Sequence, residues 1–205
     1  HESALYIWLC HQCEGYMIRL DDFNTRDLFA LWYTYIEAFP RDERAPYKRL
    51  IMNYRKGNAD FVAIRDDDET IGMIYTIIHK DLAYVFYFAL KPQYRYQGKG
   101  TKVLELMRER YRDRRLFLAV ERMDEPCDNL EDRIKRHDFY AKNGYVDLDY
   151  RLYERPLYYD VMSHGGVDIA PEEYHEMMVV WGGERVAERI GYFFVKTGED
   201  YGNRI

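Results

Sequence analysis

The sequence predicts a single α/β domain, and three observations lead to that prediction. The chain has 205 residues, a length that suits one continuous core. Hydrophobic residues make up 47% of it, enough to fill such a core without disulfides. Segments with helically spaced apolar residues alternate with short strand-like runs, and no repeat or linker separates them. We therefore expect one domain, followed by a C-terminal extension that contains a helix and a strand.

The N-terminal half predicts two helices and three strands. Apolar residues recur at helical spacing over about residues 25–39, and Pro40 ends this helix. A more polar helix follows over about residues 44–54. Strands are expected over residues 61–64, 71–79 and 82–90, with hairpin turns at residues 66–69 and 80–81.

The C-terminal half predicts the remaining elements in order. After a helix that runs to Tyr111, we expect a strand over 116–120 and a helix over about 130–142, which Gly144 ends in a left-handed conformation. Strands at 145–153 and 157–162 form a pair. The extension contributes a strand at 192–195 and a helix with the apolar stripe Tyr174, Met177, Met178 and Trp181.

Charge and hydropathy limit the classes of function. The formal net charge of -6 argues against nucleic-acid binding, which usually needs a basic face. It suits a cationic or neutral small substrate better. No apolar segment reaches the length of a membrane span, so we expect a cytoplasmic protein that does not bind membranes. Met17 directly precedes a strand-like run, so residues 1–16 are interpreted as an extension or a cloning remnant.

The sequence predicts no metal site. Cys10 and Cys13 form a C-x-x-C pair, but no second pair accompanies them, so we interpret both as incidental thiols. Glu172 and His175 have the spacing of half a di-iron motif whose other half is missing.

The most informative segment is a glycine loop between a strand and a helix. The strand ends at Leu90, Pro92 stops its pairing, and Gly98 and Gly100 open the next helix. The first amide N–H groups of a helix lack partners and carry the positive end of its dipole. A diphosphate can approach them where side chains are small. The loop lacks both the Walker and the Rossmann patterns.

Two motifs carry a resemblance to a known family. Arg95-x-x-Gly98-x-Gly100 resembles the acetyl-CoA-binding motif of the GNAT superfamily of N-acetyltransferases, Arg/Gln-x-x-Gly-x-Gly/Ala. The segment from Phe139 to Tyr145 resembles the family's Phe-Tyr-x-x-x-Gly-Phe/Tyr segment. Over residues 17–163 the resemblance implies the GNAT fold: a mixed, mostly antiparallel sheet, splayed at strands 4 and 5 and flanked by helices. Residues 164–205 would pack on the same domain as the extension.

The resemblance also implies which residues hold acetyl-CoA, the expected co-substrate. The end of the strand before the loop would pair with pantetheine through its main chain, and the N–H of Leu90 would face the thioester oxygen. The predicted cofactor-binding residues are Phe88, Ala89, Leu90, Arg95, Tyr96, Gln97, Gly98, Lys99, Gly100 and Thr101. Arg133 stands where many members have an asparagine that contacts the cofactor, and it is either a further contact or a surface charge.

Two side chains match the family's acid and base. Tyr140 corresponds to the tyrosine that protonates the departing thiolate, or else it is a buried aromatic near the cofactor. Glu121 follows a strand where several members place the carboxylate that deprotonates the amine, or else it is a solvated strand-end residue. Residues 39–44, with Asp124 and Glu125, would add an acidic mouth to the acceptor cleft, or form only a connector.

The resulting prediction is an acyl-CoA-dependent N-acyltransferase that transfers acetyl directly to a primary amine in a ternary complex. A small-molecule amine is expected rather than a protein acceptor, and a homodimer through the C-terminal elements is a reasonable assembly. A non-catalytic acyl-CoA-binding module is the alternative, since it needs the glycine loop but neither Tyr140 nor Glu121. A nucleotide or other phosphate binder has only the helix N-terminus in its favour.

Overall fold

The computed structural model describes residues 17–124, 127–154, 157–188 and 190–196. The predicted N-terminal extension, with Cys10 and Cys13, lies outside these residues, as does Glu125 of the predicted acidic mouth.

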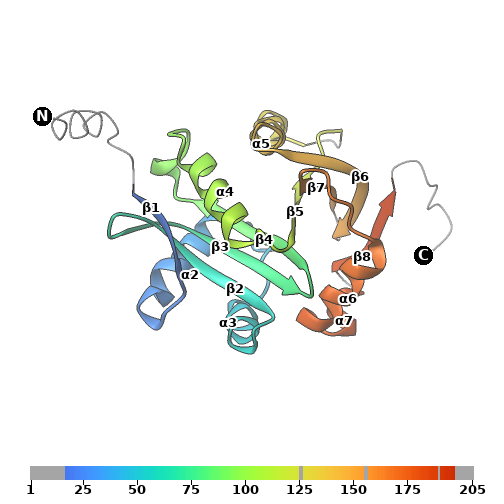
Figure 1. Ribbon diagram of the computed structural model, residues 1–205, viewed down its shortest axis with the longest axis horizontal. Helices are drawn as coiled ribbons and strands as arrows, with labels where there is room; N and C mark the ends of the chain where they lie inside the picture. The colour runs from blue at the N-terminus through green and yellow to red at the C-terminus, as the bar shows by residue number, and fades with distance from the viewer. Residues whose placement is uncertain (1–16, 125–126, 155–156, 189, 197–205) are drawn as a thin grey trace, which may run out of the picture.

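One sheet runs through the molecule (Figure 1), in the order β1-β2-β3-β4-β5-β7-β6-β8. Its strands are β1 (Ile18–Asp22), β2 (Ala59–Asp66), β3 (Glu69–His79), β4 (Leu82–Leu90), β5 (Arg115–Glu121), β6 (Tyr145–Glu154), β7 (Leu157–His164) and β8 (Ile190–Lys196). Neighbouring strands are antiparallel except β4 and β5, which are parallel. The predicted mixed, mostly antiparallel sheet is confirmed.

Helices cover both faces of this sheet (Figure 1). They are α2 (Leu28–Ala38), α3 (Tyr47–Lys56), α4 (Lys99–Arg110), α5 (Leu130–Lys142), α6 (Pro171–Gly182) and the short α7 (Glu184–Ala187), with 3-10 turns η1 (Thr25–Asp27) and η2 (Pro92–Tyr94). Side chains of α2, α3 and α6 pack into one core cluster, and those of α4 and α5 into a second. Strand alternation supplies both clusters: in β2, Phe61 and Ala63 join the first, while Val62 and Ile64 join the second.

The first helix begins where the sequence predicts, and the second begins later than predicted. The first helix begins as η1, capped by the Asn24 side chain, which accepts a hydrogen bond from the N–H of Arg26 at 2.8 Å. Trp32, one of the helically spaced apolar residues of this segment, is 43% exposed. The second helix begins at Tyr47 rather than near residue 44, because Pro46 occupies its N-cap and disfavours helical conformation in the residue before it.

The central feature of the sheet is a separation between β4 and β5. Their parallel pairing extends only from Leu82 to Val85 on β4. At the same level the register between β3 and β4 shifts, which leaves Phe86 as an extra residue in β4. Phe86 and Tyr87 consequently pack on the same core cluster although they are consecutive. Such a bulge bends and twists a strand, and β4 diverges from β5 beyond it.

The C-terminal elements join the same sheet and core. Strand β8 pairs with β6. Helix α6 buries Tyr174, Met177, Met178 and Trp181, and the Trp181 indole N–H donates to the Tyr75 hydroxyl at 3.0 Å. Within the residues that the structure describes, no helix combines the length and apolarity needed to cross a membrane.

Candidate active site

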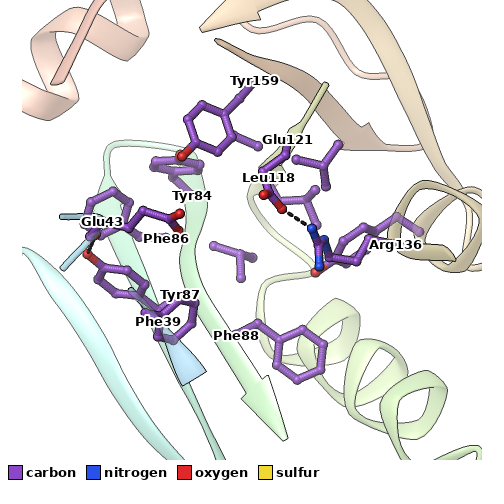
Figure 2. Close-up of a pocket in the computed structure, with 14 residues that line it drawn as sticks. Phe39, Glu43, Tyr84, Phe86, Tyr87, Phe88, Leu118, Glu121, Arg136 and Tyr159 are labelled. Carbon is purple, nitrogen blue, oxygen red and sulfur yellow. Dashed lines mark hydrogen bonds and ion pairs between the residues drawn. The ribbon is translucent and has the colours of Figure 1, made fainter. Parts of the chain in front are cut away.

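A cavity of about 160 Å³ occupies the opening between β4 and β5 (Figure 2). Its walls are residues 84–88 of β4, residues 118–121 of β5, Arg136 and Tyr140 of α5, Tyr159 of β7, and Phe39 and Glu43 from the connection between α2 and α3. It therefore brings together three of the predicted catalytic and cofactor-binding residues, namely Phe88, Glu121 and Tyr140, and two residues of the predicted segment 39–44.

The main chain at the end of β4 presents polar groups to this opening. The N–H of Lys91 donates to the carbonyl of Ile71 at 2.9 Å, which makes these two a hydrogen-bonded pair. Such pairs alternate with non-bonded pairs in an antiparallel ladder. The N–H groups of Phe88 and Leu90 therefore point away from β3, toward the side where β5 diverges, whereas that of Ala89 points to β3. Two of the three predicted strand-end residues thus direct their N–H groups away from β3, and of these two Phe88 lines the cavity.

Helix α4 begins directly after β4 and the turn η2. Gly98 is its N-cap, with a φ of 74°, a conformation that side chains rarely adopt. No side chain caps this end. The N–H groups of Lys99, Gly100 and Thr101 occupy the first turn, where a helix leaves its donors without intrahelical partners. This start fits the diphosphate of CoA, as an anion site at a helix N-terminus requires.

Three side chains of the glycine loop bond within the protein. Arg95 Nε donates to the Leu90 carbonyl at 2.9 Å, and Gln97 donates to the Gln93 carbonyl at 2.7 Å. The Lys99 ammonium is buried, forms an ion pair with Asp66, and lies 4.8 Å from the centroid of the Tyr94 ring. These side chains shape the loop, which leaves the backbone N–H groups as the donors toward a ligand. Tyr96 is 88% exposed at a positive φ of 61°.

Gly100 links the two sequence motifs in space. A Cβ atom at this position would lie 3.0 Å from Cζ of Phe139. The absence of a side chain therefore lets the Phe139 ring pack against the start of α4. Because Tyr140 follows Phe139, this contact also positions the tyrosine that lines the cavity.

Tyr140 lies in the cavity wall. Burial raises the pKa of its hydroxyl to about 12, although the nearby Arg136 opposes the rise. A phenol with this pKa keeps its proton throughout the physiological range. Within the described residues the hydroxyl has no hydrogen-bond partner, so it is available to a ligand in the cavity.

Glu121 lies at the end of β5, and its carboxylate is held by α5. Arg136 forms an ion pair and hydrogen bond with it (Figure 2), and Arg133 Nε lies 3.6 Å from its other oxygen. Arg133 is buried and donates to the carbonyl of Arg122 at 2.7 Å, so it is not a surface charge. Its contacts position the end of β5, and contact with the cofactor stays a prediction.

The sequence analysis missed several of the residues that shape this end of β5. His137 Nε2 lies 3.0 Å from the carbonyl of Glu121, one helical turn after Arg133 on the same face of α5. Arg136 precedes Tyr140 by one turn, a spacing that could have placed it in the cavity. Tyr159 could not have been found, because only the β5–β7 register, Glu121 opposite Tyr159, brings it there.

The predicted acidic mouth is present in part. Glu43 lines the cavity with Glu121, whereas Asp124 is bound to Arg122. Burial raises the pKa of Glu43, and repulsion from Glu121 and Asp42 adds to the rise. No cluster of three or more metal-ligating side chains exists in the part of the chain that the structure describes.

Comparisons with known proteins agree with this geometry. Residues 57–147 match the family model of the GNAT acetyltransferase domain. A GNAT-family protein from Bacteroides thetaiotaomicron is similar at 27% identity, with a TM-score of 0.64 over 80% of this chain and 98% of that one. Two further structures share the fold, each with a TM-score of 0.56. No curated protein sequence matches the chain.

The first of those two is the ribosomal-protein-S18-alanine N-acetyltransferase of Escherichia coli, at 19% identity over 75% of this chain and 97% of that one. The second is an aminoglycoside 6'-N-acetyltransferase complexed with coenzyme A, at 15% identity over 74% of this chain and 99% of that one. The family match, together with the splayed β4–β5 pair and the glycine loop that it contains, identifies residues 57–147 as a GNAT acetyltransferase domain.

Proposed function

We propose that the protein transfers the acetyl group of acetyl-CoA directly to a small primary amine within a ternary complex. The observation that carries the proposal is the shared cavity. A single opening contains the outward-facing main chain of β4, the protonated hydroxyl of Tyr140 and two carboxylates. Both substrates of a direct transfer can meet there without a covalent enzyme intermediate.

Each group in the opening supports one part of the reaction. Bound acetyl-CoA supplies an activated acyl carbon with a thiolate leaving group. The N–H of Leu90 donates a hydrogen bond to the carbonyl oxygen as negative charge develops on it. The Tyr140 hydroxyl donates to the sulfur as the C–S bond breaks. A carboxylate in the wall takes a proton from the acceptor ammonium, which cannot attack until it loses one.

The lining supports a small acceptor. The cavity is enclosed mainly by aromatic rings of Phe39, Phe86, Tyr87 and Tyr159 and is only about 160 Å³ in volume. The two solved relatives act on a ribosomal protein and on an aminoglycoside, so the family accommodates both kinds of acceptor. A panel of small amines, lysine peptides and peptides with free N-termini separates the two. A clear preference for peptides would contradict the small-molecule part of the proposal.

Tyr140→Phe tests the chemistry. We expect kcat for CoA release in the presence of an accepted amine to fall about 100-fold, because the donor to the sulfur is lost. The KM for acetyl-CoA should stay close to that of the wild type. Tyr145→Phe is the matched control, since its ring contacts Tyr140 at 5.7 Å but does not line the cavity. Equal rates for Tyr140→Phe and the wild type would show that Tyr140 does not donate the proton to sulfur. If the wild type released no CoA with any amine, the alternative of a non-catalytic acyl-CoA-binding module would be favoured.

A further inference from the structure

Two carboxylates enter the cavity from opposite walls, and their surroundings differ (Figure 2). Glu121 comes from β5 and is engaged by the guanidinium groups of Arg136 and Arg133. Glu43 comes from the connection between α2 and α3. Within the described residues its carboxylate forms no ion pair and no hydrogen bond. Glu121 is therefore paired directly with guanidinium groups, whereas the positive charges of Arg136 and Arg133 act on Glu43 only at longer range.

This difference leaves Glu43 the carboxylate that is open to an ammonium group in the cavity. One oxygen of Glu121 accepts a hydrogen bond from Arg136, and the other lies 3.6 Å from Arg133 Nε, so both oxygens already have a cationic partner in the protein. Glu43 is half-buried, and burial together with repulsion from Glu121 and Asp42 raises its pKa, although attraction to Arg136 and Arg133 opposes the rise. A raised pKa brings a carboxyl closer to the range in which a general base works at neutral pH.

The position of Glu43 is fixed by β4 itself. The Tyr87 hydroxyl donates to the Glu43 carbonyl at 2.9 Å and accepts from the N–H of Ala45 at 2.9 Å. The Tyr35 hydroxyl donates to the Ala45 carbonyl at 2.9 Å. Tyr87 directly follows the bulge residue Phe86. The strand that faces the thioester therefore also holds the connection that carries Glu43.

Aromatic rings surround the space in front of Glu43. Phe39 and Tyr87 pack with ring centroids 4.8 Å apart, and Phe86 and Tyr87 with centroids 4.5 Å apart. The faces of such rings attract an ammonium group, and the attraction is stronger where water is excluded. A carboxylate that has no direct partner among the described residues and lies beside aromatic rings is suited to a primary ammonium.

We propose that Glu43, rather than Glu121, binds the acceptor ammonium and removes its proton, while Glu121 holds Arg136 in the cavity wall. This rests on the proposed acetyl transfer. One N–H bond of the ammonium breaks and its proton moves to Oε of Glu43. The freed nitrogen lone pair forms the N–C bond as the C–S bond breaks. The second nitrogen proton replaces the one that Tyr140 gives to sulfur, and Glu43 releases the first to solvent.

The test compares Glu43→Gln with Glu121→Gln, two isosteric changes, in the amine dependence of CoA release across pH. For Glu43→Gln we expect kcat/KM for the amine to fall about 100-fold at neutral pH. The loss should shrink as pH approaches the pKa of the acceptor, because the free amine needs no base. For Glu121→Gln we expect a smaller loss that does not change with pH.

The charged or titratable groups facing Glu43 are Asp42 on its own connection, Tyr84 and Tyr87 on β4, Glu121 on β5, Arg133 and Arg136 on α5, and Tyr159 on β7.

Controls keep each outcome decisive. Glu37→Gln removes an exposed carboxylate from the neighbouring α2 and should match the wild type. Calorimetric CoA binding reports whether Glu43→Gln is folded, and Glu43→Asp should regain part of the lost rate. If Glu121→Gln shows the pH-dependent loss and Glu43→Gln does not, the assignment is wrong while acetyl transfer stands. If the wild type binds CoA but acetylates no amine, the proposed function fails instead.

Discussion

Gly98 and Gly100 occupy one motif but meet different physical requirements. Gly98 has a positive φ with nothing near the place of a Cβ atom, so its requirement is conformational. Gly100 lacks that constraint. Its requirement is space, because a Cβ atom there would lie 3.0 Å from Cζ of Phe139. The second glycine thus serves α5 as well as any phosphate at the start of α4.

Gly100→Ala should lower kcat about tenfold, because the displaced Phe139 ring shifts the adjacent Tyr140, and small displacements of a reacting group are costly. Phe139→Leu provides the matched test. In the double variant the added methyl has room, so the combined loss should be smaller than the product of the two single losses. Steady-state kinetics of the four proteins measure this coupling, and independent effects would show that the contact does not position Tyr140.

At this scale the sequence predicted backbone roles better than side-chain roles. The glycine loop was found because Gly, Pro and the flanking strand are adjacent in the chain. The partners of Arg95 and Lys99 could not be predicted in the same way. Asp66 lies in a strand 33 residues before Lys99, and only the fold brings it near. Likewise, the pairing of Glu121 with guanidinium groups depends on Arg133 and Arg136, which project from α5.

Among the elements, α4 is tied to β2 by the pair of Lys99 and Asp66. The Lys99 side chain is 4% exposed and that of Asp66 is 15% exposed. The pair fixes the first turn of α4, and hence its amide donors, relative to the sheet. Its contribution is mainly to position, since a buried ion pair adds little net stability over apolar residues of the same size.

Asp66→Ala should lower the free energy of unfolding by about 3 kcal/mol, because the buried ammonium loses its carboxylate partner. The double variant Lys99→Met with Asp66→Leu should recover most of this stability yet bind CoA less tightly, as the helix start is less constrained. Urea unfolding and calorimetry measure the two effects. A loss below about 1 kcal/mol for Asp66→Ala would be typical of a surface pair and would contradict this view.

The hairpins and most helix positions could be predicted because their signals are local. The β4 bulge could not be located from residues 82–90, since nearly every residue there is apolar or aromatic. A change of alternation is visible in a sequence only where polar residues mark one face. The family resemblance predicted that strands 4 and 5 separate, and the structure shows that the separation begins at Phe86.

At the scale of the whole molecule, tyrosine hydroxyls connect the helices to one another and to the sheet. The chain contains 21 tyrosines. Tyr47 donates to the Leu28 carbonyl at 3.1 Å, Tyr54 to that of Phe23 at 3.1 Å, and Tyr75 to that of Leu50 at 3.1 Å. Tyr75 also accepts from Trp181, which connects α6 of the C-terminal extension to the sheet.

The division of the chain into domain and extension, the homodimer and the cytoplasmic location stay predictions.

Tyrosines with a raised pKa should make the protein sensitive to alkali. Burial raises the pKa of Tyr35, Tyr47, Tyr75, Tyr111 and Tyr145 above the ordinary value of about 10. The folded protein keeps these protons at a pH where the unfolded chain loses them. Stability is therefore fully present below about pH 10 and should fall as pH rises beyond it.

Thermal melts in a series of buffers from neutral to strongly alkaline pH, followed with tyrosinate absorbance, measure this dependence. We expect ionisation of these side chains and loss of structure to occur together. Tyrosinate absorbance that develops fully while the melting temperature stays constant would show that these hydroxyls are accessible in the folded protein.

The bulge at Phe86 makes the cavity depend on the length of β4. With one residue fewer between Val85 and Tyr87, alternation would continue and β4 could remain paired with β5 beyond Val85. The opening, the outward amides and the Tyr87 support for Glu43 would then be lost together. Inserting or deleting a residue in this strand should therefore disrupt the site more than any single substitution there. Transferring this site to another protein would first require a β4 strand of the same length, and only then the same side chains.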